Sequence, residues 1–430
     1  MESSQQSVVM DSPPRAGTTA AREAVSTRGA RDARALGLVS SAHFTVDTFS
    51  NMYAPLLPLL IPRLGLSLAA AGGLAMAFQA AASLSQVGFG RLADRWRPRV
   101  LLVGGPFLAA LMLSLLGFAR SRLELGFLLV GGGLGVAAFH PPGAMLAYRS
   151  GGHQPGFAMS VFVTSGTLGF AMAPLVVAPL AEHYGLHATA WLMGPGLLVF
   201  LCFLWKAPAM PSANRAHGRK LSELRPVARP LGLLYSVVVL RTMATLSFAT
   251  FVPVLLTEQG MSVSQAGRAV ALYLFACGIG GFWGGTLADR FGPRRVIIIS
   301  LVAATPFVLT SLLFDRWTFA LLLAVGGCFL QSTQPVNVSF AQTLAPRHAA
   351  TVSSLMMGAA WGMGGILAPA TGWVGDQLGL RVTLFLLGLL PLVAAACAAR
   401  LPEDRRVHAP ARSAEVGVAE PAGTGNAGAA

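Results

Sequence analysis

The chain has 430 residues, of which 54% are hydrophobic and only 11% are charged. Soluble domains carry about 25% charged residues, so this composition excludes a soluble globular protein and makes the lipid bilayer the expected partner. The net charge of +14 would suit a nucleic-acid-binding protein, but the basic residues gather in particular loops as orientation signals, and we expect no nucleic-acid partner.

Apolar runs long enough to cross a bilayer follow one another along the chain. Residues 1–34 are rich in Ser, Ala and Arg and are expected to form a disordered tail, and residues 401–430 a second one. The predicted spans are residues 36–61, 68–90, 100–119, 125–148, 157–181, 187–205, 230–256, 265–288, 295–314, 317–344, 350–375 and 379–399. This pattern predicts an all-α membrane protein with twelve transmembrane helices.

The two halves of the chain resemble each other. Three residues of the first half recur 195 residues later in the second, Gly131, Gly169 and Pro174 as Gly326, Gly364 and Pro369. A basic segment at 207–229 separates the halves. We therefore predict two pseudo-symmetric six-helix bundles, 35–206 and 230–400, joined by that linker.

Positive charge predicts the orientation. If the N-terminus is cytoplasmic, most Lys and Arg residues fall in the tails and the inward loops. Only six fall in outward loops, namely Arg63, Arg120, Arg122, Arg268, Arg316 and Arg381. The positive-inside rule then predicts that the linker and both termini are cytoplasmic.

A short charged turn follows the second span of each half. The sequence GRLADRWRPR begins at residue 90, and GTLADRFGPRR begins at residue 285, which is again a shift of 195 residues. Twelve spans, two parallel halves, a central basic linker and a G-x-L-A-D-R-x-G-x-R-R turn resemble the major facilitator superfamily over about residues 35–400. The second turn is complete, whereas the first has Arg97 in place of its second glycine.

The resemblance implies a gating role for these turns, since such turns in the superfamily hold one helix end against another in one gate state. The residues concerned are Gly90, Asp94, Arg95, Gly285, Asp289, Arg290, Arg294 and Arg295. The alternative is a plain turn that joins two helices.

A narrower resemblance is to the fosmidomycin resistance protein family of bacterial drug exporters. The matching residues are His43, Asp47, Phe78-Gln79, Phe139-His140-Pro141, Ser150-Gly151-Gly152, Ser160, Phe162, Gly166 and Gly169. The resemblance implies proton-coupled export of small drug-like or toxic compounds across a bacterial inner membrane. Two positions depart from the family pattern: Pro142 replaces a glutamate, and Ala173 replaces a glycine before Pro174.

Asp47 is the one carboxylate among seventeen that lies near the middle of an apolar run. An ionisable group at that depth costs at least about 2.5–3.5 kcal/mol, so it normally faces a cavity or a partner. His43 and Asn51 lie one turn away on either side, on the same helix face. We expect these residues to contribute to a proton or substrate site. The alternative for Asp47 is a permanent ion pair with Arg241.

His140 precedes Pro141 and Pro142, which lack N–H groups and should kink the helix beside a titratable side chain. Transporters commonly build midplane sites at broken helices. His140 is therefore a second site candidate, or else it only caps the break.

Arg241 is the one basic residue deep in a predicted span. An anionic substrate or Asp47 could neutralise it. Candidate cavity amides are Gln79, Gln331, Gln334 and Asn337.

Three rival functions are an uptake symporter for a small organic acid or other metabolite, a membrane-embedded enzyme and a non-transporting sensor. Neither an H-E-x-x-H motif nor a pair of close intramembrane carboxylates is present, which argues against the enzyme. No folded soluble domain that a sensor needs is visible, and no nucleotide-binding loop is found. The four cysteines lack metal-site spacing. We expect a monomer without a metal or cofactor.

Overall fold

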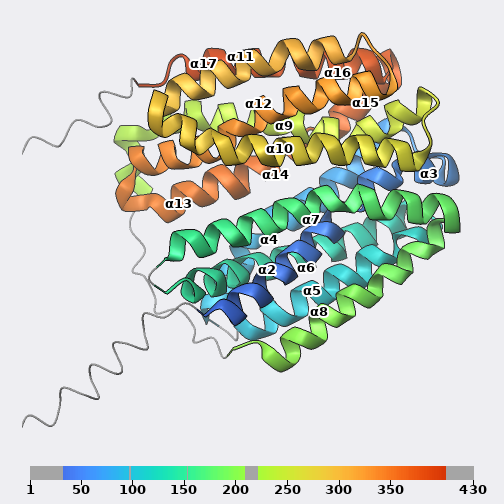
Figure 1. The fold of residues 1–430 in the computed structure, drawn as a ribbon, viewed down its shortest axis with the longest axis horizontal. Coiled ribbons are helices and arrows are strands. Elements are labelled where there is room, and N and C mark those ends of the chain that lie inside the picture. The colour runs from blue at the N-terminus through green and yellow to red at the C-terminus, as the bar shows by residue number, and fades with distance from the viewer. Residues whose placement is uncertain (1–31, 96–97, 153, 209–220, 403–430) are drawn as a thin grey trace, which may run out of the picture.

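The computed structural model describes residues 32–95, 98–152, 154–208 and 221–402. These residues form helices and no strand. Figure 1 shows two bundles of long helices lying side by side, the first drawn from blue to green and the second from yellow-green to red.

The first bundle extends from α2 to α8. Its elements are α2 (Ala33–Ser50), α3 (Tyr53–Leu64), α4 (Leu68–Arg95), α5 (Pro98–Ser114), η1 (Leu115–Phe118), α6 (Arg122–Ser150), α7 (Pro155–Tyr184), η2 (Leu186–Leu192) and α8 (Met193–Lys206).

The second bundle extends from η3 to α17. Its elements are η3 (Leu221–Val227), α9 (Ala228–Glu258), α10 (Val263–Phe291), α11 (Pro293–Ser311), α12 (Arg316–Leu344), η4 (Pro346–His348), α13 (Ala349–Ser354), the π-turn η5 (Leu355–Ala359), α14 (Ala360–Ile366), α15 (Ala368–Leu378), α16 (Leu380–Gly388) and α17 (Leu390–Ala398).

Eleven helical stretches of the described residues are long and apolar enough to cross a membrane. The helices α2 and α3 follow each other with only Asn51 and Met52 between them, and together they supply the remaining crossing of the predicted twelve. The predicted all-α membrane fold is confirmed.

The prolines of α6 do not interrupt the helix, so the expected kink at Pro141 and Pro142 is not a chain break. The helix α6 continues from Arg122 to Ser150 with both prolines inside it. The break lies instead in the first span at Asn51, whose φ of −107° and ψ of 19° end α2. Pro55 has no N–H for the Asn51 carbonyl, which favours an interruption there. A broken helix therefore does lie near Asp47, but in its own span.

Small residues allow close helix contacts where lipid supplies no hydrophobic force between helices. A Cβ atom on Gly169 of α7 would lie 2.0 Å from the Phe44 carbonyl oxygen of α2. A Cβ atom on Gly284 of α10 would lie 1.8 Å from the Ser332 carbonyl oxygen of α12. These glycines bring the backbones of site-bearing helices together.

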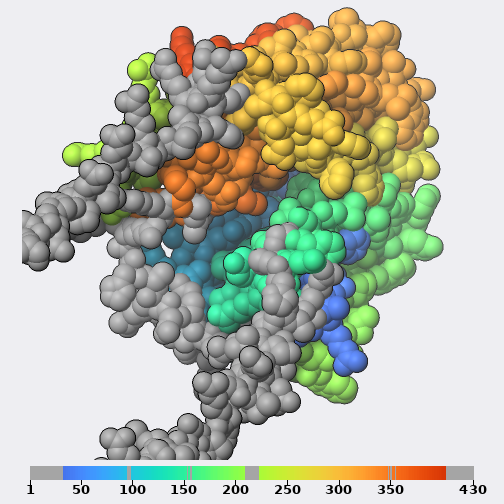
Figure 2. All heavy atoms as spheres, turned by 60° about the vertical axis from the view of Figure 1, so that its left-hand side comes forward, coloured from blue at the N-terminus to red at the C-terminus, as the bar shows by residue number. Residues whose placement is uncertain are grey.

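The bundle has two end faces. The start of α2, the end of α17 and both ends of the linker lie at the left-hand end in Figure 1, which we call the termini face. Figure 2 looks towards this face and shows a hollow between orange residues of the second bundle and green and teal residues of the first. The other end, which carries the α3–α4 and α9–α10 connections, is called the opposite face.

Candidate functional site

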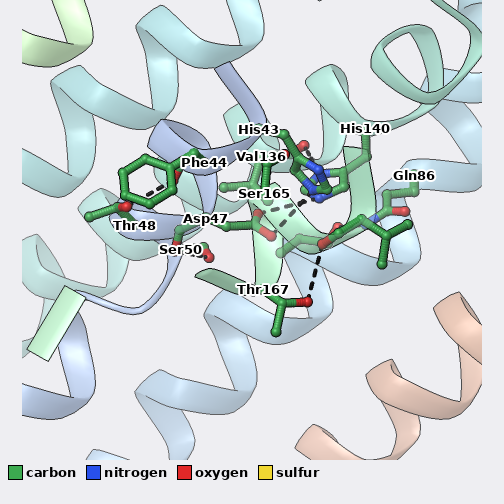
Figure 3. A network of polar contacts seen from close by, with 12 residues as sticks. His43, Phe44, Asp47, Thr48, Ser50, Gln86, Val136, His140, Ser165 and Thr167 are labelled. Carbon is green, nitrogen blue, oxygen red and sulfur yellow. Dashed lines mark hydrogen bonds and ion pairs between the residues drawn. The ribbon is translucent and has the colours of Figure 1, made fainter. Parts of the chain in front are cut away.

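His43, Asp47 and His140 form one compact cluster. His43 Nε2 lies 3.3 Å from Asp47 Oδ2, and His140 Nε2 lies 3.4 Å from Asp47 Oδ1. Figure 3 shows the two rings converging on the carboxylate from α2 and α6. The side chain of His43 is 7% exposed, that of Asp47 18% and that of His140 23%, so the cluster is buried on one side and reachable on the other.

Both histidine rings bind a backbone carbonyl through the nitrogen that faces away from Asp47. His43 Nδ1 lies 2.7 Å from the Phe162 oxygen, and His140 Nδ1 lies 2.8 Å from the Val136 oxygen. A carbonyl oxygen only accepts hydrogen bonds, so each Nδ1 carries a hydrogen. Each Nε2 then faces the carboxylate either with a lone pair or with a second hydrogen. Attraction therefore requires a proton in each of the two Nε2–carboxylate contacts.

Gly166 gives the cluster its space on the side of α7. A Cβ atom there would lie 2.4 Å from His43 Cε1 and 2.6 Å from Asp47 Oδ2. The Phe162 ring, one turn earlier, stacks on His43 with centroids 3.9 Å apart. The helix α7 thus positions His43 by a ring contact and a carbonyl, and leaves room for the carboxylate. Sequence reasoning matched Gly166 to a family pattern but did not predict this contact.

Asn51 lies outside the cluster. Its Nδ2 donates to the Phe170 carbonyl oxygen at 2.9 Å, which ties the end of α2 to α7. The expected same-face trio of His43, Asp47 and Asn51 is therefore divided, because the helix ends at Asn51. His140 from α6 takes the third place instead.

The three cluster residues are the one group of three or more His, Cys, Asp and Glu residues in the described ranges whose potential ligand atoms lie within 4.8 Å of one another. The Nε2 atom of each ring contacts a carboxylate oxygen directly, and a proton between the two atoms satisfies both partners. The arrangement can therefore take up or release a proton at each of the two contacts.

A second polar cluster lies in the second bundle. Arg241 of α9 is fully buried and donates hydrogen bonds to Gln331 Oε1 and, at 3.1 Å, to Thr242 Oγ1. Gln331 in turn donates to Gln334. No carboxylate in the described part of the chain pairs with Arg241, so the alternative ion pair with Asp47 is absent from this structure.

The helices that carry this second cluster, α9 and α12, also carry unsatisfied polar atoms. Asn337 is 1% exposed, and neither its amide nitrogen nor its amide oxygen has a partner among the described residues. The Nε of Arg241 is also buried without a partner there. Buried polar groups are normally hydrogen-bonded, so these atoms offer unused donors and an acceptor inside the protein.

Gln79 of α4 lies where the two bundles meet. Its Nε2 donates to Ser83 Oγ at 2.7 Å. A Cβ atom on Gly365 of α14 would lie 2.4 Å from Gln79 Cγ, which places the amide against the other bundle. The structure therefore places Gln79 in neither polar cluster.

The sequence profile of the Major Facilitator Superfamily matches residues 39–267 and 234–425. The chain belongs to the Major Facilitator Superfamily. It is a membrane transporter and not an enzyme.

Two bacterial relatives are similar along most of their length. An uncharacterised transporter of this superfamily, YfnC of Bacillus subtilis (strain 168), is 31% identical over 387 residues, which cover 86% of this chain and 93% of YfnC. The fosmidomycin resistance protein of Escherichia coli (strain K12) is 29% identical over 374 residues, which cover 83% of this chain and 90% of that protein.

The fold is shared with solved transporters. A bacterial homologue of the human lysosomal transporter Spinster, in an inward-facing and occupied conformation, superposes with a TM-score of 0.73. The sequences are 18% identical, and the match covers 87% of this chain and 98% of that one.

The superfamily turn of the second half links α10 to α11 on the termini face. Gly292 has a φ of +87°, which explains the need for glycine at this position. Asp289, Arg290 and Arg295 are exposed and have no hydrogen bond or ion pair within the described residues. Arg294 donates to the Ala399 carbonyl oxygen. In this state Asp289 therefore holds no neighbouring helix.

The corresponding turn of the first half is described only in part. Gly90 lies in α4 and approaches Pro141 of α6, with a Cβ-to-Cβ distance of 3.9 Å if a methyl group were added. The side chains of Asp94 and Arg95, and the whole of Arg97, lie outside the described residues. Their expected gating role stays a prediction.

Proposed function

We propose that this chain exports small drug-like or toxic compounds in exchange for protons, by alternating access between two sides of a bacterial inner membrane. The observation that carries the proton coupling is the arrangement of two histidine Nε2 atoms around one carboxylate, with both Nδ1 hydrogens already bound to carbonyls. Protons are the species that this arrangement takes up and releases.

Proton release would change helix contacts in the first bundle. Asp47 and His43 are carried by α2, His140 by α6, and His43 is tied to α7 through Phe162. Without a shared proton, an Nε2 lone pair faces a carboxylate oxygen, and the two repel. The three helices then favour a different spacing, which links the protonation state to the shape of the hollow.

The second polar cluster is proposed to bind substrate. Arg241, Gln331, Gln334 and Asn337 combine a buried cation with amides that lack a full set of partners. Gln79 at the meeting of the bundles would contact the same substrate from the first half. Proton and substrate sites thus lie in different bundles, which suits coupling through movement of one bundle against the other.

Export is preferred to uptake because the fosmidomycin resistance protein is similar over most of both chains. The fold is shared by exporters and uptake transporters and does not by itself decide direction. The basic linker supports a cytoplasmic termini face, and the chain is proposed to act as a monomer.

The test is a compound-sensitivity screen of bacteria with and without the gene. Export predicts protection against at least one compound. The same compound should dissipate an imposed proton gradient in inside-out membrane vesicles that contain the protein. Hypersensitivity, or new growth on a metabolite, would favour the uptake symporter. Protection without any proton movement would contradict the proposed proton coupling but not the proposed export.

A further inference from the structure

Two carboxylates on the opposite face each bind the first turn of a helix in the other bundle. Glu182, in the last turn of α7, accepts hydrogen bonds from the backbone N–H groups of Val263 at 3.1 Å and Ser264 at 2.9 Å. Asp376, in the last turn of α15, accepts from Leu68 at 2.8 Å and Ala69 at 2.9 Å. Both contacts therefore cross from one bundle to the other.

The two contacts are related by the internal repeat. Four residues of the α3–α4 connection recur 195 residues later at the α9–α10 connection, Gly65, Ser67, Ala71 and Gly72 as Gly260, Ser262, Ala266 and Gly267. Each carboxylate stands three residues before a glycine with positive φ that ends its helix, Gly185 at +81° and Gly379 at +79°. The same device thus occurs once in each half.

Each helix start is fully satisfied only with the carboxylate of the other bundle. In α10, the Ser262 hydroxyl accepts from the Gln265 N–H, and the Gln265 side chain accepts from the Ser262 N–H. The N–H groups of the two residues between them, Val263 and Ser264, donate to the Glu182 carboxylate. The first turn of a helix has no internal acceptors for these groups and carries positive charge, so a carboxylate is the matching partner.

The backbones beside these contacts touch through the repeated glycines. A Cβ atom on Gly72 would lie 2.3 Å from the Ala368 oxygen of α15, and one on Gly267 would lie 2.7 Å from the Pro174 oxygen of α7. The opposite face is therefore closed along two seams, α4–α15 and α7–α10. The termini face, in contrast, is hollowed and leaves Asp289 without a partner in the described residues.

We propose that Glu182 and Asp376 are gate residues that close the opposite face, and that both contacts must break together before that face opens. The proposal rests on the alternating access proposed above, but on neither the substrate nor the coupling ion. Because the bundles move as units, loss of one contact also weakens the other. A carboxylate that only capped a helix locally would have no such distant effect.

Hydrogen–deuterium exchange of the full-length protein in lipid nanodiscs tests this proposal without substrate or a gradient. Glu182→Gln should accelerate exchange at Val263 and Ser264 and also at Leu68 and Ala69, on the order of tenfold for a lost charge-assisted hydrogen bond. The matched control is Glu124→Gln. Glu124 lies on the same face but accepts from the Arg120 N–H within its own bundle, at 2.8 Å, so neither seam should change.

Acceleration confined to the seam of the mutated residue would identify a local helix cap and overturn the gate. Unchanged exchange at both seams would overturn it as well. If Glu182→Gln does not fold, Asp376→Asn replaces it in the same experiment, and exchange should again accelerate at both seams. Asp376 is exposed, so this replacement should not disturb folding. If the exchange experiment contradicts the gate while transport and proton movement are intact, the proposed function is not affected.

Discussion

Asp47 and Arg241 do not contact each other, although both lie deep in corresponding spans of the two halves. Asp47 faces the Nε2 atoms of His43 and His140 in the first bundle. Arg241 donates to Gln331, and both of these residues lie in the second bundle. Neither charge is therefore the permanent counter-ion of the other in this structure. The effects of removing each charge should be independent.

The first prediction concerns Asp47→Asn. An asparagine can donate to one Nε2 and accept from the other, so we expect stability to fall by less than about 1 kcal/mol. Proton-driven transport should disappear, while exchange of substrate for substrate survives. Proton flux in vesicles and thermal unfolding measure the two effects.

The control for that experiment is the double variant with Arg241→Gln. If Asp47 neutralised Arg241, the single variant would lose about 3–5 kcal/mol and the double variant would recover it. We expect no recovery of stability or transport. A well-folded Asp47→Asn protein with full proton-coupled transport would remove Asp47 from the mechanism.

Gly166→Ala should separate the members of the proton cluster. The added methyl group would fall 2.4 Å from His43 Cε1 and 2.6 Å from Asp47 Oδ2, so one of these side chains must move. Overpacking of this kind typically costs about 1–3 kcal/mol. We expect proton movement per transported substrate to decrease, as measured in vesicles.

Gly37→Ala is the matched control for Gly166→Ala, because Gly37 of α2 has nothing within 4 Å of an added Cβ atom. It should leave transport unchanged and add up to about 0.5–1 kcal/mol of helix stability. If the two variants move the same number of protons per transported substrate, Gly166 does not support the cluster.

Asp289→Asn tests the superfamily turn. In this structure Asp289 is exposed and has no partner in the described ranges, so expression and thermal stability should stay within about 0.5 kcal/mol of wild type. Transport should slow if the carboxylate binds a neighbouring helix when the termini face closes. Loss of expression would favour a purely structural turn. The rate of substrate exchange in vesicles measures the effect.

Orientation can be checked with single cysteines in a background in which the four native cysteines are replaced. A cysteine at Ser212, in the linker and outside the described residues, should resist a membrane-impermeant thiol reagent added to intact cells. A cysteine at Leu313, which is 75% exposed on the opposite face, should react. The reverse pattern would place the termini face outside the cell.

The sequence by itself determined the class of protein, the number of spans and the internal repeat. These features follow from local physics, because each span must be apolar and must satisfy its own backbone hydrogen bonds in lipid. It also indicated that Asp47 and His140 are unusual, since a charged or titratable group within an apolar run is costly wherever its partners lie.

Only the tertiary structure decided which side chains meet. His140 rather than Arg241 approaches Asp47, because α6 packs beside α2 in the same bundle. The side chain of Asn51 binds the carbonyl oxygen of Phe170, a residue far along the chain, and so lies outside the cluster. Glu182 and Asp376 have no unusual feature in the sequence, because the N–H groups that donate to their carboxylates belong to the other bundle. Contacts of this kind depend on helix packing, which no local pattern of residues encodes.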